Sequence, residues 1–225
     1  MDALDTYKAE LKELDKFESP TFTVSDFNYF FNVGISKYIT DNYGDFDVLQ
    51  KDLDDISALL VFNHALTFSA NKALLPSDYR HSLGLELKLK FTNDTIDYSI
   101  GDEITVYPKR LKTNRKGYTA ENAYQQPSHE YATYQVDSEQ IIIYIGTNVE
   151  IVSGTMDYIK IPDKVYLNPD RSADYTDPVN NTPIQFPDYV TFEIIKQCRL
   201  SFLENIESPR YNSSLQDIQL DKMKE

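Results

Sequence analysis

The sequence predicts an α+β fold in which an N-terminal helical hairpin and a C-terminal helix form one bundle, with an antiparallel β-sheet or small barrel inserted between them. Apolar residues recur at three- and four-residue steps near both ends of the 225-residue chain, and they alternate with polar residues in its middle. We expect an N-terminal helical region over 1–78, a β-rich insert over 79–168, a loop over 169–185, and a C-terminal helix with an extended tail over 186–225. The C-terminal helix should pack on the region 1–78.

Three helices are expected in the N-terminal region. The first runs from Asp2 to Phe17, and the second follows a capping box at 23–26 and ends at Gly44. A third helix should come directly after it and end at Pro76, and the short connection predicts that the second and third helices form an antiparallel hairpin. The positions expected to line one side of the third helix are Leu49, Leu53, Ile56, Leu60, Asn63 and Thr67.

Strands are expected from Leu83 onward, where the apolar period changes from helical spacing to two. Leucines at 83, 85, 87 and 89 alternate with Gly84, Glu86 and lysines, which indicates a strand with one buried face. Further strands are expected at 104–107, 140–145 and 156–162. No helical pattern separates these runs, so an antiparallel arrangement is favoured over a nucleotide-binding βαβ unit.

The last helix is expected to begin near Pro187, which suits a first helical turn, and to end at Ser208-Pro209. Beyond it, the polar segment from Tyr211 to Glu225 should be extended until it meets a partner. The apolar side of this helix comprises Val190, Ile194, Ile195, Cys198, Phe202 and Ile206.

The composition predicts contact with other proteins. The chain has 36 acidic and 22 basic residues, so its average surface with a formal charge of -14 repels nucleic acid and anionic membranes. Its 17 Tyr and 12 Phe suit large interfaces, although an AT-rich genome would also favour these residues. No secretory signal or membrane-spanning run occurs, so we expect the chain to stay in the cytosol until it joins an assembly.

The sequence offers little for catalysis. It has no Gly-rich phosphate loop, no nucleophile elbow and no paired Cys or His at metal-ligand spacing. We therefore expect no enzyme activity, catalytic residue, metal or cofactor, and we interpret His64, His81, His129 and Cys198 as structural residues. The polar side of the third predicted helix, with Lys51, Asp52, Asp54 and Asp55, is interpreted as solvated and not as a metal site.

One basic run stands out in this acidic chain. It could be a solvated loop tip, a contact between subunits, or a surface that faces DNA. Acidic residues in the first third of the chain, such as Asp41, Asp45 and Asp47, could meet it on an adjacent copy. The run comprises Lys109, Arg110, Lys112, Arg115 and Lys116.

Three parts of the sequence resemble the head-to-tail connector, or ring, proteins of short-tailed crAss-like bacteriophages. The first is the aromatic helix from Phe27 to Gly44. The second is the junction 75–83, and the third combines Tyr158-Ile159-Lys160-Ile161-Pro162 with 186–211. Their order along the chain carries the resemblance, which spans most of it.

The junction 75–83 also has a physical interpretation. Pro76 should stop the helix, Asp78 should turn the backbone, and Tyr79 should fill the space between bundle and sheet while its hydroxyl finds a polar partner. Together with His81, these residues are expected to orient the two subdomains. Pro209, Arg210 and Tyr211 should end the last helix and send the tail along a neighbouring subunit.

The resemblance implies a structural protein of the virion neck or tail, assembled in the cytoplasm of the bacterial host. It implies rings of twelve copies that extend and seal the DNA exit channel, in contact with the portal and with other connector or tail proteins, with DNA passing nearby and without a membrane. A different class is a host-surface or glycan-binding module that uses the Tyr-rich β region.

Overall fold

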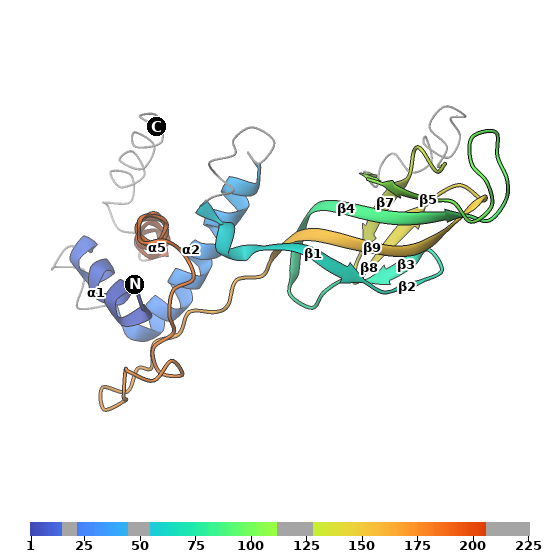
Figure 1. Ribbon diagram of the computed structural model, residues 1–225. Coiled ribbons are helices and arrows are strands. Elements are labelled where there is room, and N and C mark those ends of the chain that lie inside the picture. Colours follow the sequence, from blue (N-terminus) through green and yellow to red (C-terminus); the bar gives the residue numbers. More distant parts are fainter. Residues whose placement is uncertain (15–21, 45–54, 112–127, 206–225) are drawn as a thin grey trace. The chain divides into compact units, whose positions relative to one another are not determined.

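The computed structural model describes residues 1–14, 22–44, 55–111 and 128–205, and it divides into two units (Figure 1). The helical unit combines the segments Met1–Ala58 and Pro162–Glu225, and the β unit is the continuous segment Leu59–Ile161. The predicted α+β class is confirmed, because helices occur near both ends and two mainly antiparallel sheets lie between them.

The first helix, α1 (Ala3–Glu13), begins at Asp2, whose side chain accepts a hydrogen bond from the Asp5 backbone N–H at 2.8 Å. This bond satisfies one of the donors that a helix N-terminus leaves without an intrahelical partner. The backbone N–H of Ala3 donates to the carbonyl oxygen of Thr182 at 3.0 Å, and the Met1 ammonium lies 2.9 Å from the Asp188 carboxylate. The start of the chain is therefore held by the segment that leads into the last helix.

The second helix, α2 (Val24–Gly44), begins at the predicted capping box. The Thr23 backbone N–H donates to Asp26 Oδ2 at 2.9 Å, and the Asp26 backbone N–H donates to Thr23 Oγ1 at 3.2 Å. Phe27, Phe31 and Ile35 recur on its buried side, as the spacing predicts.

The last helix, α5 (Asp188–Asn205), packs against both α1 and α2, which confirms the predicted bundle of N- and C-terminal helices. The ring of Phe202 meets Phe22 and Phe30 edge-on, with centroids 4.8 and 5.6 Å apart. At Gly34 the two backbones come close, since a Cβ there would lie only 3.2 Å from the carbonyl oxygen of Ile194. The closeness of α2 and α5 thus depends on a residue without a side chain.

The predicted third helix is wrong over 60–74, while its start at 45–54 lies outside the described residues. A short 3-10 helix (η2, Ser57–Leu59) is followed by the strands β1 (Leu60–Leu66), β2 (Phe68–Ser69) and β3 (Lys72–Leu74). Two of the six positions assigned to its apolar side, Asn63 and Thr67, are polar. Asn63 also has a φ of 54°, which breaks any helix there. The helical hairpin predicted from this segment is corrected accordingly, and the β unit begins at Leu59 and not at residue 79.

The β unit contains two sheets. The first has the order β1-β9-β4-β5 and is antiparallel throughout, with β4 (Tyr79–Phe91), β5 (Glu103–Val106) and β9 (Val149–Lys160). The second has the order β2-β3-β8-β7-β6, with β6 (Lys109–Arg110), β7 (Thr133–Asp137) and β8 (Gln140–Tyr144). Only the pairing of β6 with β7 is parallel among these described strands. The strands predicted at 83–89, 104–107, 140–145 and 156–162 are confirmed as β4, β5, β8 and β9, with shifted ends.

Both sheets contribute to one apolar core. Leu85, Leu87 and Leu89 of β4 lie in it together with Ile141 and Ile143 of β8. The alternation that predicted the strands is the alternation of buried side chains, because successive residues of a strand point to opposite faces.

The segment 169–185 runs without a helix or strand, as expected. Aspartates hold its turns, with the carboxylates of Asp170, Asp174 and Asp177 each accepting the backbone N–H two residues further on at 2.9 to 3.0 Å. In the part of the chain that the structure describes, no helix combines the length and the apolar character needed to cross a bilayer.

Candidate interaction surface

Two residues of the predicted basic run lie on the edge of a sheet. Lys109 and Arg110 form β6, the outermost strand of the five-stranded sheet, and both are exposed. Lys112, Arg115 and Lys116 follow directly in the sequence but lie outside the described residues. The visible part of the run is therefore accessible to a partner.

The fold brings the start of β4 toward this edge. Arg110 pairs with Tyr134 of β7, and the Tyr134 hydroxyl lies 2.9 Å from Ser82 Oγ of β4, in a buried hydrogen bond between the two sheets. Arg80 and His81 directly precede Ser82 on β4. Two segments that are 28 residues apart in sequence thus contribute cations to one surface.

The electrostatics of His81 reflect this arrangement. Burial lowers the pKa of its imidazole, and the guanidinium groups of Arg80 and Arg110 lower it further. Burial also lowers the pKa of Arg80. We call Arg80, His81, Lys109 and Arg110 the basic surface. Sequence reasoning assigned His81 to the junction and missed Arg80, because tertiary contacts such as the hydrogen bond between Ser82 of β4 and Tyr134 of β7 bring this part of β4 toward β6.

The other junction residues lie within the β unit. The prediction that Pro76 ends a helix is wrong, because this residue follows the strand β3. The expected turn at Asp78 is confirmed by the Tyr79 N–H, which donates to the Pro76 carbonyl oxygen at 3.0 Å. The Asp78 carboxylate accepts the Tyr158 hydroxyl at 2.9 Å, and the Tyr79 ring lies 6.0 Å from that of Tyr158. These contacts close the base of β4 against the end of β9.

The pKa of the Tyr158 hydroxyl is strongly raised. Burial raises its pKa to about 12, helped by the hydrogen bond and the negative charge of Asp78. The role of the junction in orienting two subdomains stays a prediction. The predicted tail contacts Pro209, Arg210 and Tyr211 lie outside the described residues.

The single cysteine lies in the helical bundle. Cys198 of α5 is buried beside Glu10 of α1, and burial together with Glu10 raises the pKa of its thiol well above the ordinary value. A buried thiol that keeps its proton is a poor nucleophile. Within the described ranges, no group of three or more His, Cys, Asp or Glu side chains converges as metal ligands would.

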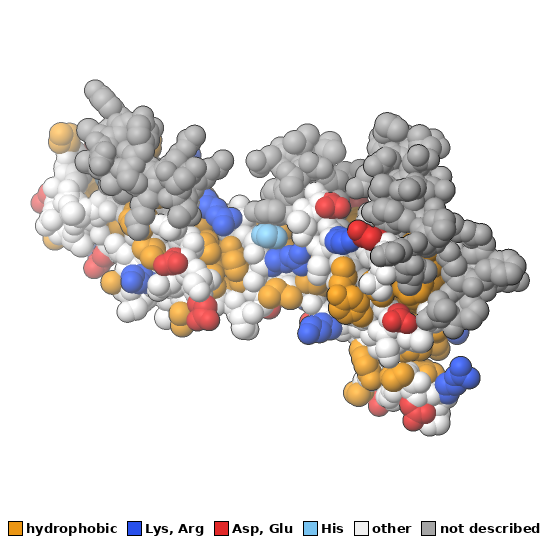
Figure 2. Space-filling view, turned by 180° about the vertical axis from the view of Figure 1, so that it is seen from behind, with side chains coloured by type: hydrophobic (Ala, Val, Ile, Leu, Met, Phe, Trp, Pro, Cys, Tyr) orange, Lys and Arg blue, Asp and Glu red, His pale blue; other side chains and the backbone are white. Residues whose placement is uncertain are grey.

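Large apolar side chains are exposed in both units. Figure 2 shows such side chains in several places on the face that it displays. Exposed apolar residues that gather on a surface are typical of sites that contact other proteins. In the β unit the exposed side chains include Phe62, Leu74, Ile96, Ile100, Tyr107, Tyr131 and Val152, and in the helical unit Tyr29, Val179, Tyr189 and Phe192.

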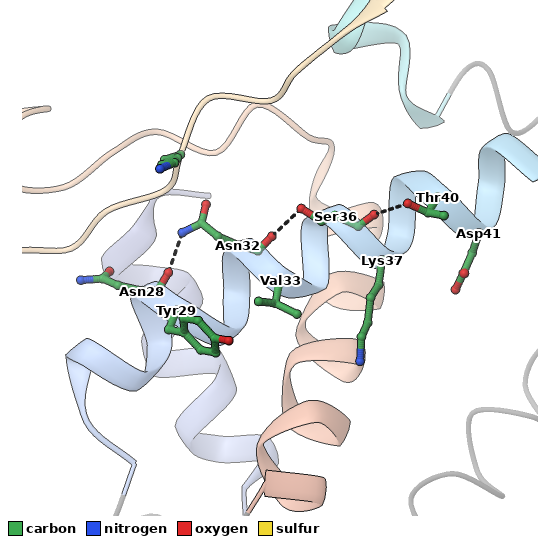
Figure 3. A pocket seen from close by; sticks show the side chains of 9 residues that line it. Asn28, Tyr29, Asn32, Val33, Ser36, Lys37, Thr40 and Asp41 are labelled. Atoms are coloured by element: carbon green, nitrogen blue, oxygen red, sulfur yellow. Dashed lines mark hydrogen bonds between the residues drawn. The ribbon is translucent and has the colours of Figure 1, made fainter. Parts of the chain in front are cut away.

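A groove of about 550 Å³ follows α2 in the helical unit (Figure 3). The side chains of Asn28 and Asn32 in this groove bind the backbone of the extended segment beside the helix, at Leu167 and Val165 respectively. Their hydrogen-bonding capacity is therefore used within the chain. Besides Lys164, the lining comprises two rows of α2 at four-residue steps, Asn28, Asn32, Ser36 and Thr40 beside Tyr29, Val33, Lys37 and Asp41.

Comparison with known proteins assigns no family, since no protein-family model matches the chain and no curated protein matches its sequence.

Proposed function

We propose that this chain is a structural subunit of a phage portal–tail connector, which joins copies of itself into a ring that extends and seals the DNA exit channel. Its partners in the virion neck are the portal and other connector or tail proteins. The proposal is supported by the resemblance of the three sequence segments and by the uneven division of charge between the two units. It requires no reaction at any residue.

The charge division is the observation on which the proposal mainly rests. The two segments of the helical unit carry 24 acidic and 12 basic residues, a formal charge of -12, whereas the β unit carries 12 acidic and 10 basic residues, a formal charge of -2. The basic surface therefore belongs to the less acidic unit. One chain thus offers two surfaces of opposite character.

A ring of identical subunits needs two different complementary surfaces on each copy. We propose that the basic surface of one copy faces the acidic helical unit of the next. Charge attraction of this kind steers association and weakens as salt is added, because the Debye length falls from about 10 Å at 0.1 M to about 3 Å at 1 M.

Reversal of two charges tests this contact. Lys109→Glu combined with Arg110→Glu changes only exposed side chains of β6 and should leave the fold intact. We expect the wild-type chain to form an oligomer of defined mass that dissociates as salt is raised, and the variant to be mainly monomeric in sedimentation velocity. Lys88→Glu is the control within the β unit, because Lys88 is exposed on β4 and each substitution changes the net charge by the same amount. An unchanged mass and salt dependence in the β6 variant would refute the contact.

A glycan-binding role is the second candidate. Tyr107 and Tyr131 of the β unit are 72% and 61% exposed, and exposed aromatic rings can stack on the apolar faces of sugars. This role predicts that the wild-type protein binds in a glycan array and that Tyr107→Ala with Tyr131→Ala abolishes binding. Electron cryomicroscopy of particles that contain the chain would separate the two candidates, since only a connector subunit forms a ring beside the portal.

A further inference from the structure

The loop between β4 and β5 presents an apolar side chain to solvent. Ile96 is 101% exposed and Ile100 is 65% exposed, although hydrogen bonds hold the loop in one conformation. The ring of Tyr98, between them in sequence, stacks on Phe91 with centroids 4.5 Å apart and an interplanar angle of 11°. The loop therefore turns its aromatic residue inward and leaves its isoleucines exposed.

Hydrogen bonds within the loop fix this arrangement. The Ile100 N–H donates to Asp94 Oδ1 at 2.7 Å, and the Ser99 N–H donates to Asp102 Oδ2 at 2.8 Å. The Gly101 N–H donates to the Phe91 carbonyl oxygen at 2.9 Å. A loop ordered before binding loses little conformational entropy when its apolar tip is buried by a partner.

A pocket of about 580 Å³ lies elsewhere in the β unit, between β1 and the β2–β3 hairpin. β1 and β2 are the outer strands of their sheets, so the pocket occupies an open edge of the two-sheet core. Its wall is mainly apolar, with Leu66, Phe68 and Leu74 among the lining side chains. A volume of this size accommodates a branched aliphatic side chain with its flanking backbone.

The loop of the same copy does not fill this pocket. The β4–β5 loop follows Phe91, which pairs with Val149 at the start of β9, whereas Leu66 at the pocket pairs with Gly154. These positions on β9 are five residues apart, which is roughly 16 Å along a strand. The loop also continues away from the pocket beyond Phe91, so Ile96 can enter such a pocket only on another copy.

The charges of the loop and the pocket are complementary. Between 92 and 103 the sequence has four acidic residues, Asp94, Asp97, Asp102 and Glu103, and no lysine or arginine. Lys72 lines the pocket, together with His64, and no acidic residue is among its lining. An acidic loop with an apolar tip therefore matches an apolar pocket with a basic rim.

We propose that the pocket receives Ile96 from the β4–β5 loop of a second copy of this chain, with Asp97 beside Lys72. The contact is head-to-tail, since each copy offers a loop on one side and a pocket on the other, and such contacts build rings or filaments. It uses residues outside the basic surface and does not rest on the phage role.

Cysteine cross-linking tests the contact directly. Ile96→Cys and Leu74→Cys are introduced into separate proteins, which are mixed under mild oxidation; the native Cys198 is buried and should not react. We expect a mixed disulfide between the two variants, because Leu74 lies in the pocket wall and is exposed. Val179→Cys replaces Leu74→Cys in the control, since Val179 is 75% exposed in the other unit. Equal cross-linking of Ile96→Cys to both partners would overturn the proposal.

A charge exchange provides a second measurement in the full chain. Asp97→Lys alone and Lys72→Glu alone should each weaken self-association by roughly two- to fivefold, as expected for an exposed ion pair, and a mixture of the two variants should recover it. Ile96→Asp should weaken it roughly tenfold or more, because a buried aliphatic side chain is lost. A wild-type chain that is monomeric at all concentrations, or a pocket that is covered only when another protein is added, would contradict a second copy as the occupant.

These outcomes separate this contact from the basic surface. If Ile96→Cys and Leu74→Cys do not cross-link, while reversal of Lys109 and Arg110 still disrupts the oligomer, only the loop-and-pocket contact is refuted. If the two cysteines cross-link but the charge reversal has no effect, only the proposed pairing of the basic surface with the acidic helical unit is refuted.

Discussion

Asn32 bonds to both backbone groups of Val165. Its side-chain Nδ2 donates to the Val165 carbonyl oxygen at 2.8 Å, and its Oδ1 accepts the Val165 N–H at 2.9 Å. Asn28, one helical turn earlier, makes the same pair of bonds with Leu167, at 2.9 Å each. This side of α2 thus binds the extended segment as a neighbouring strand would, and it holds every second residue of that segment, Val165 and Leu167.

Asn32→Leu should destabilise the helical unit. The substitution keeps a similar size but leaves both backbone groups of Val165 without this partner, for an expected cost of about 2–4 kcal/mol from two lost bonds. Chemical denaturation followed by circular dichroism would measure it. Asp41→Asn on the same helix is exposed and serves as a control that should change little. Equal stability of the two variants would show that water replaces the asparagine without loss.

Glu10 should make the stability of the helical unit depend on pH. Burial raises the pKa of its carboxyl from 4.5 to about 8. The folded state therefore binds this proton more tightly than the unfolded state, so stability is complete below about pH 4.5 and falls as the pH rises to about 8. The slope contributed by one group is about 1.4 kcal/mol per pH unit.

Glu10→Gln should remove this slope, because an amide resembles the protonated carboxyl and does not titrate. Denaturation midpoints from pH 5 to 8 would reveal the difference between variant and wild type. The neighbouring pair Arg199–Glu13, 3.7 Å apart, is present in both proteins and cancels in the comparison. Parallel pH profiles would contradict a buried, protonated Glu10.

Tyr158→Phe should destabilise the β unit by about 1–2 kcal/mol, because Asp78 loses a donor in a partly buried position. In the wild type, the hydroxyl should titrate near pH 12, and its contribution to stability is lost as the pH rises from 10 toward 12. NMR of ring-labelled tyrosine measures this titration. Tyr131→Phe is the control in the same unit, since Tyr131 is exposed.

Gly34→Val should destabilise the bundle by about 1–3 kcal/mol through overpacking. A Cβ at this position meets the backbone of α5 at the Ile194 carbonyl, which cannot turn aside as a side chain can. Ser36→Val introduces the same β-branched side chain at an exposed position of α2 and accounts for helix propensity. The difference in thermal midpoint between the two variants isolates the packing effect.

Local patterns predicted the elements whose causes are local. The capping box at Thr23 and Asp26 and the alternation along β4 need only neighbouring residues, and both are confirmed. The segment 60–74 differs, because its strands β1 and β3 exist through pairing with β9 and β8, which lie far along the chain. Its leucine spacing fits a helix, but the distant partners decide its structure.

The same limit applies to the basic surface. The run at Lys109 and Arg110 is recognisable in the sequence, whereas the contribution of Arg80 follows from tertiary contacts between the sheets, among them the hydrogen bond between Ser82 and Tyr134. The burial of Glu10 could not be predicted either, since a glutamate within a short amphipathic helix ordinarily lies in water. Its burial follows from how α1 is rotated against α5.

The β unit enters and leaves through directly paired positions, because Leu60 of β1 stands opposite Ile159 of β9. Cα atoms in such antiparallel pairs are only about 4.5–5.5 Å apart, so a turn of two residues could join the chain ends that its removal would create. A chain that lacks the β unit should therefore still fold as the helical bundle. The β unit itself should be transferable as one insertion into an exposed hairpin of another protein.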